Sequence, residues 1–344
     1  VSVSAGSHGR HELASPNEFV TGLDSLRLFA AAIVAVCHLA RNLPSPPPSL
    51  AEALFFHQLA LLANGQAAVG LFFVISGFCI HYRQAATLRV DTGPFLAART
   101  IRVGVPLLAV TAIAACWGAW ATAALQSVLW SLYCELAYYL TYPILLACRR
   151  RWRMRNILVV AVIVSAVLVL LQPRHDFLQD YGIATALVCY PLWLAGCWLA
   201  ERDQLVRPKS GNSILLWRLA ALALCWFFPF GPYGPLDVSA AVKLALVGLF
   251  SMAYLPAELT RWKASAPPIW SEALGRSSYS LYLVHILPIA LFTRLPTGMT
   301  FWPVIALELA AITAFTFAAY WLCEAPAHRL AKTVGRKRSM PVAA

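Results

Sequence analysis

The chain has 344 residues, of which 60% are hydrophobic and only 12% are charged, and its formal net charge at pH 7 is +12. Soluble globular domains carry about 25% charged and about 45–50% apolar residues, so this composition excludes the soluble classes. A transmembrane helix needs about 20 residues, so the length accommodates about ten spans in one domain.

Apolar runs along the chain predict an all-α fold, a polytopic integral membrane bundle of about ten transmembrane helices. Helices are expected because lipid offers no hydrogen bonds to open backbone groups. Only a few residues around Gln126 separate the third and fourth spans. The predicted spans are residues 21–42, 63–82, 103–122, 127–147, 156–172, 183–200, 212–229, 237–257, 277–294 and 301–323.

The basic residues are strongly biased to one side of this predicted topology. If the N-terminus is cytoplasmic, the inner segments carry 22 of the 27 Lys and Arg residues. This bias follows the positive-inside rule, so we expect both termini in the cytoplasm. The predicted organisation is a polar N-terminal tail (1–18), a membrane domain (19–332) and a basic C-terminal tail (333–344). The excess charge is expected to face anionic lipid headgroups and not nucleic acid.

The first predicted span carries two ionisable residues, Arg27 and His38, and such groups are costly inside a membrane. Their separation is close to three helical turns, which puts both on one helix face, roughly 16 Å apart along the axis. A neutral imidazole can take a hydroxyl proton, and a guanidinium holds anions. A carbonyl-bonded histidine and a snorkelling arginine are the alternatives for either residue alone, but the pair favours function.

Two further segments carry candidate binding residues. Arg99 and Arg102 lie on one helical face at the start of the third span, which suits forked binding of phosphate oxygens. The alternative is that these two arginines only set the orientation of the helix in the membrane. In the second span, Ser76 and Gly77 form a small pair that permits close helix approach, so packing alone is an alternative explanation there.

The fourth predicted span contains a carboxylate, Glu135, among aromatic residues. A carboxylate there is costly unless it is paired or protonated. We expect Glu135 to orient a His or Arg or to accept a proton, with a structural hydrogen bond as the alternative. Secondary candidates are Asp24, Tyr139, His285 and Glu324, and Glu324 is expected near the cytoplasmic interface, where a snorkelling carboxylate needs no function. The nine cysteines show no paired spacing, so neither a metal site nor a disulfide framework is expected.

These segments, in this order, resemble the bacterial membrane acyltransferase family 3, the O-acyltransferases of O-antigen, Nod factor, exopolysaccharide and macrolides. The resemblance covers the chain from about residue 18 to 332. No single motif is specific, but six in one order across a ten-span topology are. The matching segments are residues 23–27 with His38, 70–78, 99–102, 130–139, 278–285 and 324–326.

The resemblance implies an O-acetyltransferase of the bacterial cytoplasmic (inner) membrane. It implies transfer of an acyl group, with acetyl expected, from cytoplasmic acyl-CoA to a hydroxyl of a surface or lipid-linked glycan or a glycosylated small molecule. The Arg-x10-His signature falls on Arg27 and His38, and the Arg-x-x-Arg motif falls on Arg99 and Arg102. Ser76 is counted with the last two as donor-binding. Acetyl-CoA is then a co-substrate, and no permanently bound cofactor is expected.

The hypothesis for the mechanism is direct transfer. Arg27, Arg99 and Arg102 would hold the CoA phosphates, while His38 deprotonates the acceptor hydroxyl and Glu135 orients that imidazole. An acyl-histidine relay, a succinyl or longer acyl donor, and a secondary transporter remain alternatives. A transporter would be expected to show internal repeats and Gly/Pro-broken helices near the midplane, which the sequence pattern does not indicate.

Overall fold

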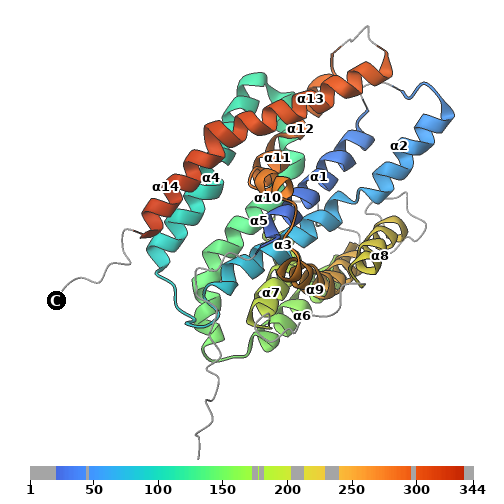
Figure 1. Ribbon diagram of the computed structural model, residues 1–344. Helices are drawn as coiled ribbons and strands as arrows, with labels where there is room; N and C mark the ends of the chain where they lie inside the picture. The colour runs from blue at the N-terminus through green and yellow to red at the C-terminus, as the bar shows by residue number, and fades with distance from the viewer. Residues whose placement is uncertain are drawn as a thin grey trace, which may run out of the picture.

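The computed structural model describes residues 21–43, 46–172, 177, 182–202, 213–228, 240–295 and 300–336. All regular secondary structure in these ranges is helical, which confirms the predicted all-α fold (Figure 1). The predicted tail 1–18 and residues 337–344 of the predicted C-terminal tail lie outside the described residues.

Each predicted span falls on a helix or a pair of helices. Seven helical segments within the described ranges are long and apolar enough to cross a membrane, so the count of ten spans stays a prediction. The helices are α1 (Leu23–Arg41), α2 (Leu50–Leu62), α3 (Gly65–Tyr82), α4 (Thr92–Trp117), α5 (Ala119–Arg149), α6 (Met154–Leu171), α7 (Ile183–Arg202), α8 (Ser213–Phe227), α9 (Ala240–Ala264), α10 (Ile269–Gly275), α11 (Ser278–Val284), α12 (Ile286–Phe292), α13 (Phe301–Ala319) and α14 (Ala325–Arg336).

The helix surfaces support a membrane environment. In α6, Met154 is the one buried residue of the helix, whereas Val160, Ile163 and Leu170 are exposed. Water would disfavour so large an apolar surface, but lipid accommodates it. We therefore treat the seven long apolar segments as membrane-spanning.

The boundary between the third and fourth predicted spans was placed wrongly. The chain turns at Gly118 (φ +108°, ψ −176°) and not near Gln126, which lies inside α5. This backbone conformation is almost restricted to glycine. Because the apolar pattern continues across the turn, hydropathy alone does not locate the boundary between these two helices.

The ninth predicted span is interrupted, contrary to the expectation of unbroken helices. It forms α11 and α12, with His285 between them. Pro288 has no N–H, so the carbonyl of Val284 loses its partner one turn away. The break therefore places a histidine at an irregular point inside the bundle.

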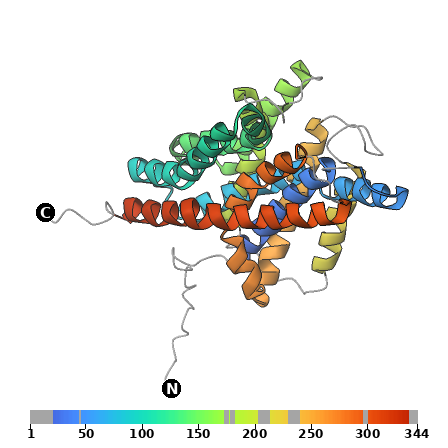
Figure 2. The same ribbon diagram turned by 90° about the horizontal axis from the view of Figure 1, so that it is seen from above.

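The last predicted span continues further than residue 323. A π-helical turn, Tyr320–Glu324, joins α13 to α14. Seen from above, the three segments form one long rod that runs across the molecule (Figure 2). Pro326 removes a backbone donor in this region, which favours a local change of helical pitch.

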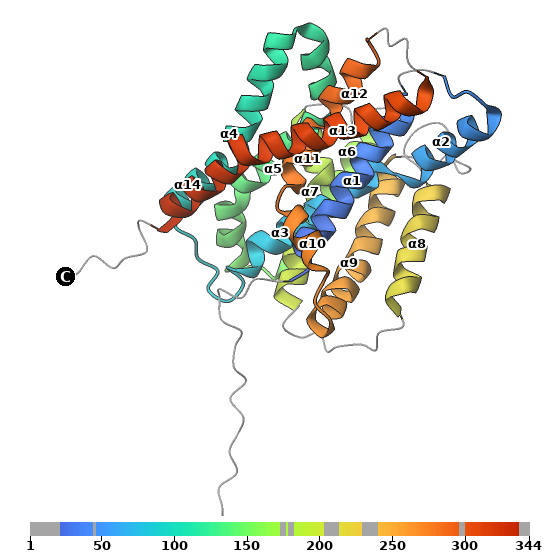
Figure 3. The ribbon, with the colours of Figure 1, turned by 45° about the horizontal axis from the view of Figure 1, so that its top comes forward.

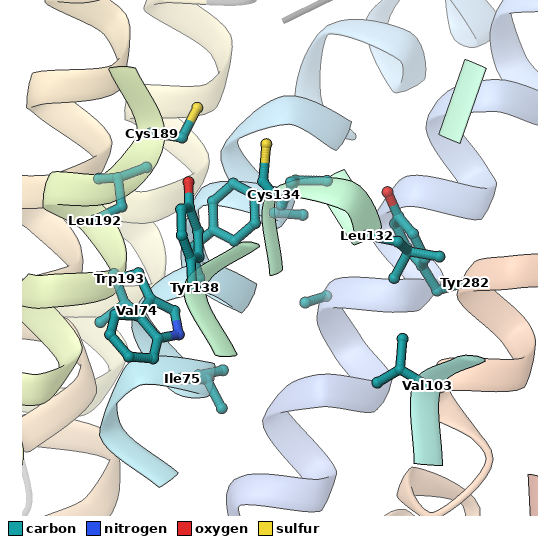
Figure 4. Close-up of a cluster of buried hydrophobic side chains, with 14 of the residues drawn as sticks. Val74, Ile75, Val103, Leu132, Cys134, Tyr138, Cys189, Leu192, Trp193 and Tyr282 are labelled. Carbon is teal, nitrogen blue, oxygen red and sulfur yellow. The ribbon is translucent and has the colours of Figure 1, made fainter. Parts of the chain in front are cut away.

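The helices pack around α3 and α7, the most extensive contact in the bundle. Trp193 of α7 is fully buried beside Val74 of α3, and its ring centre lies 5.7 Å from that of Tyr138 in α5 (Figure 4). Around this centre, α4 and α14 run together along one edge, and α8 and α9 lie side by side along the opposite edge (Figure 3).

A buried polar network joins α3, α5 and α7 at the end where these helices carry basic residues. His81 is completely buried, with Nδ1 3.1 Å from the Tyr142 hydroxyl and Nε2 3.0 Å from Glu201 Oε1. Arg149 donates to both carboxylate oxygens of Glu201. Removing one member of such a network leaves its partners without compensation.

Replacing Glu201 with Gln is expected to lower the free energy of unfolding by about 1–3 kcal/mol, because an amide cannot accept both Arg149 bonds. The measurement is the temperature at which detergent-solubilised protein loses its monodisperse peak on size-exclusion chromatography. Asp91→Asn is the control, since Asp91 is exposed and makes no side-chain cap bond. Equal midpoints for the two variants would contradict this role.

Candidate active site

A cavity of about 1180 Å³ lies between the N-terminal end of α1 and helices α3, α4, α5, α11 and α14. It brings together residues that are far apart in the sequence. Its size exceeds the range of about 300–1,000 Å³ usual for small-ligand pockets. Eight predicted site residues line it, namely Asp24, Arg27, Ser76, Arg99, Arg102, Glu135, Tyr139 and Glu324.

The cavity walls carry an excess of positive charge. Seven Lys and Arg residues line the cavity against four Asp and Glu residues. This excess suits a polyanionic ligand. Sequence analysis counted three of these cations and missed the rest, because their helices meet only in the folded bundle. The missed cations are Arg83, Arg276, Arg329 and Lys332.

The predicted arginines are held in different ways. Arg27 donates from Nη1 to Asp24 Oδ1 (2.9 Å) and from Nη2 to the Cys79 sulfur (3.1 Å). The Arg99 guanidinium lies 5.6 Å from the ring centre of Phe95 and 5.7 Å from that of Tyr139. Arg27 is therefore fixed by a carboxylate, whereas Arg99 is held against aromatic faces.

Glu135 belongs to a hydrogen-bonded set on the cavity wall. Its Oε1 accepts from the Ser76 hydroxyl (2.8 Å) and from the Tyr139 hydroxyl. Ser76 Oγ in turn accepts from the indole N–H of Trp193 (3.3 Å). The expectation that Glu135 orients His38 was wrong, because the carboxylate is bonded within α3 and α5 instead.

The group beside His38 is another histidine. The ring centres of His38 and His285 are 5.2 Å apart, with 55° between the planes. His285 is completely buried, and its Nδ1–H donates to the Leu281 carbonyl (3.0 Å), since a carbonyl can only accept. Its Nε2 therefore carries a lone pair, and it has no hydrogen-bond partner among the described residues.

Neither histidine lines the large cavity, and Tyr282 lies between the cavity and this pair. Tyr282 lines the cavity, and its ring centre lies 6.2 Å from that of His285. Its hydroxyl donates to the Val128 carbonyl (3.0 Å) and lies 2.7 Å from Ser131 Oγ. Arg27 and His38 thus share α1, but only Arg27 reaches the cationic cavity.

Two carboxylates, one buried and one partly buried, bind the N-terminal turns of the histidine-bearing segments. Glu324 is 2% exposed and accepts from the Ser280 N–H (3.0 Å) and hydroxyl (2.6 Å). Glu272 of α10 accepts from the Ser25 N–H and hydroxyl at the same two distances. The alternative that Glu324 only snorkels at the interface does not fit this burial and bonding. Sequence analysis missed Glu272, because it lies in a loop-like segment with no apolar pattern.

The chain is 29% identical to nodulation protein 10 of Rhizobium leguminosarum bv. viciae over 62% of this chain and 58% of that protein. It thus spans less than two thirds of that relative. It is 25% identical to acyltransferase MdmB of Streptomyces mycarofaciens over 80% of each chain.

No solved structure matches this chain. The family profile described as an acyltransferase domain matches residues 20–324, which include all ten predicted site residues. By this match over most of its length, the chain belongs to acyltransferase family 3.

Proposed function

We propose that this chain is a membrane O-acyltransferase that moves an acyl group, with acetyl expected, from acyl-CoA to a hydroxyl of a carbohydrate acceptor. The observation that carries the proposal is the convergence of Arg27, Arg99 and Arg102 on one cavity, with the His38–His285 pair behind Tyr282. The family and the acyltransferase relative support the reaction type.

The cationic cavity is the proposed donor site. Acyl-CoA carries several phosphate charges, and guanidinium groups bind phosphate oxygens through forked, charge-assisted bonds. Arg99 and Arg102 are assigned to these phosphates, and Ser76 with its Glu135 and Tyr139 partners borders the path of the thioester. The basic segments face the cytoplasm under the positive-inside rule, which is where acyl-CoA is made.

His38 is the proposed general base. The acceptor oxygen attacks the thioester carbonyl carbon, its proton passes to the imidazole of His38, and the carbon–sulfur bond breaks to release the CoA thiolate. Direct transfer needs no nucleophile on the protein. The location proposed is the bacterial inner membrane, with a surface or lipid-linked glycan, or a glycosylated small molecule, as acceptor.

Replacing His38 with Ala is expected to reduce acyl transfer by about 10²- to 10⁴-fold, the usual contribution of a general base. The measurement is transfer of radiolabelled acetyl from acetyl-CoA to the cell-envelope glycan fraction in membranes that contain each variant. His57→Ala is the control, because His57 is exposed on α2. Full transfer by the His38 variant would exclude it as the base.

The same assay separates the alternative functions. Label that appears only with succinyl-CoA or a longer acyl-CoA would change the donor but keep the chemistry. Label that accumulates in vesicles as unchanged acyl compound, without product, would indicate a transporter instead.

A further inference from the structure

Glu308 of α13 is the most anomalous buried group in the described part of the chain. It is 0% exposed, and neither carboxylate oxygen has a hydrogen-bond partner among the described residues. An unpartnered carboxyl group in a membrane span is unfavourable in either protonation state. His285 Nε2 is a second buried acceptor without a partner in this part of the chain.

Both groups belong to the same region of the bundle. Glu308 lies between Ile305 and Ile312 on one buried stripe of α13. Ile312 packs with Leu39 of α1 and with Ile289 of α12. The Glu308 side of α13 therefore covers the last turns of α1, where His38 is located, and the helix that follows His285.

On its other side, Ile305 belongs to one packed cluster with Ala40 and with Phe56 of α2. Leu39 and Ala40 directly follow His38 in the chain, so the two isoleucines that flank Glu308 belong to the same packed clusters as the two residues after this histidine. Glu308 is thereby placed against the same turn of α1 as the proposed base.

The chemistry of this region differs from that of the cationic cavity. A carboxyl group and an imidazole lone pair are hydrogen-bond acceptors, and they match ligands that donate through hydroxyl groups. A carboxylate would repel phosphates, so this region does not suit the CoA headgroup. Tyr282 lines the cavity and lies beside His285, so it borders the place where an acceptor hydroxyl at the histidines would have to meet a thioester from the cavity.

We propose that Glu308 and His285 bind the acceptor, a neutral hydroxyl-rich ligand such as a sugar ring, between α1, α12 and α13. The proposal rests on the proposed function and adds the place and chemistry of acceptor recognition. One hydroxyl is presented to His38, which takes its proton as the oxygen attacks the thioester. Neighbouring hydroxyls donate to Glu308 and to His285 Nε2, which satisfies the two buried acceptors.

The test compares Glu308→Leu and His285→Phe with wild type in membranes, with two readouts. Transfer of labelled acetyl to the envelope glycan fraction is expected to fall by about 10- to 100-fold, the effect of losing a hydrogen bond to a charged or buried group. The dissociation constant of tritiated CoA is expected to stay within about twofold of wild type, because these residues lie outside the donor cavity.

Thr316→Val is the matched control, since Thr316 is buried on the same stripe and bonds only to its own helix at Ile312. It is expected to transfer at the wild-type rate. Intact CoA binding shows that each variant is folded, and Glu308→Gln, which keeps the shape and one acceptor oxygen, is expected to lose less activity than Glu308→Leu.

Two results would overturn the acceptor site. One is wild-type transfer by Glu308→Leu, and the other is loss of CoA affinity in parallel with loss of transfer. No transfer by the wild-type protein with any acyl-CoA would instead defeat the proposed function itself.

Discussion

Replacing Arg99 and Arg102 together with Gln is expected to weaken binding of acyl-CoA by about 100-fold or more. Each guanidinium lost from a phosphate removes a charge-assisted hydrogen bond, worth about 1.5–3 kcal/mol or roughly tenfold to a hundredfold in affinity. Both residues line the cationic cavity. The measurement is the dissociation constant of tritiated acyl-CoA for the purified protein in nanodiscs.

The control for this pair is Arg294→Gln. Arg294 is exposed, lies 5.5 Å from the ring centre of Trp120 and does not line the cavity. Its replacement removes one positive charge of the same kind outside the cavity and should leave the dissociation constant unchanged. Raising the salt concentration should weaken binding to wild type more steeply than binding to the double variant. Salt screens the attraction between the guanidinium groups and the phosphates, and the double variant has two fewer guanidinium groups to screen. Equal affinity of wild type and the double variant for acyl-CoA would mean that the donor binds outside the cationic cavity.

The helical fold could be predicted because lipid leaves few other structures available to so apolar a chain. The ends of helices were less predictable. Gly118 and Pro288 are the residues that break the pattern, and each is a local signal in the sequence. Their effects depend on backbone hydrogen bonding, which hydropathy does not report.

Part of the composition of the cavity could also be predicted from the sequence. Ionisable residues within apolar spans are rare, so those present point to a site. The hydrogen-bond partners of these residues could not be predicted from the sequence. Glu135 meets Ser76 across 59 positions of sequence, and Ser25 meets Glu272 across 247. Such contacts depend on how each helix is rotated about its axis.

The histidines also show that tertiary contacts do not follow from residue spacing within one helix. The three-turn spacing of Arg27 and His38 is real, but Tyr282 lies between the cavity and the histidine pair. His285 was a secondary candidate, and it becomes the neighbour of His38 at the break between α11 and α12. Spacing within one helix therefore predicted the face but not what covers it.

Replacing Gly196 or Gly77 with Ala is expected to disrupt the fold more than any other single change discussed above. A Cβ at Gly77 would lie 1.9 Å from the Trp193 carbonyl oxygen, and one at Gly196 would lie 1.9 Å from the Val74 carbonyl oxygen. Both obstacles are backbone atoms, so no side-chain rotation relieves them. Helices α3 and α7 would have to separate at the centre of the bundle.

We expect either variant to lose about 3 kcal/mol of stability, the upper part of the range for overpacking, and to elute as aggregate after mild heating. The measurement is the midpoint temperature of the monodisperse size-exclusion peak in detergent. Gly93→Ala is the control, because no atom lies within 4 Å of a Cβ at that position of α4. There alanine should be neutral or slightly stabilising, since it is the better helix former. A wild-type midpoint for Gly196→Ala would mean that α3 and α7 do not meet as closely as described. The hydrogen bond from Trp193 of α7 to Ser76 of α3, and through Ser76 the contact with Glu135, would then be less tightly fixed as well.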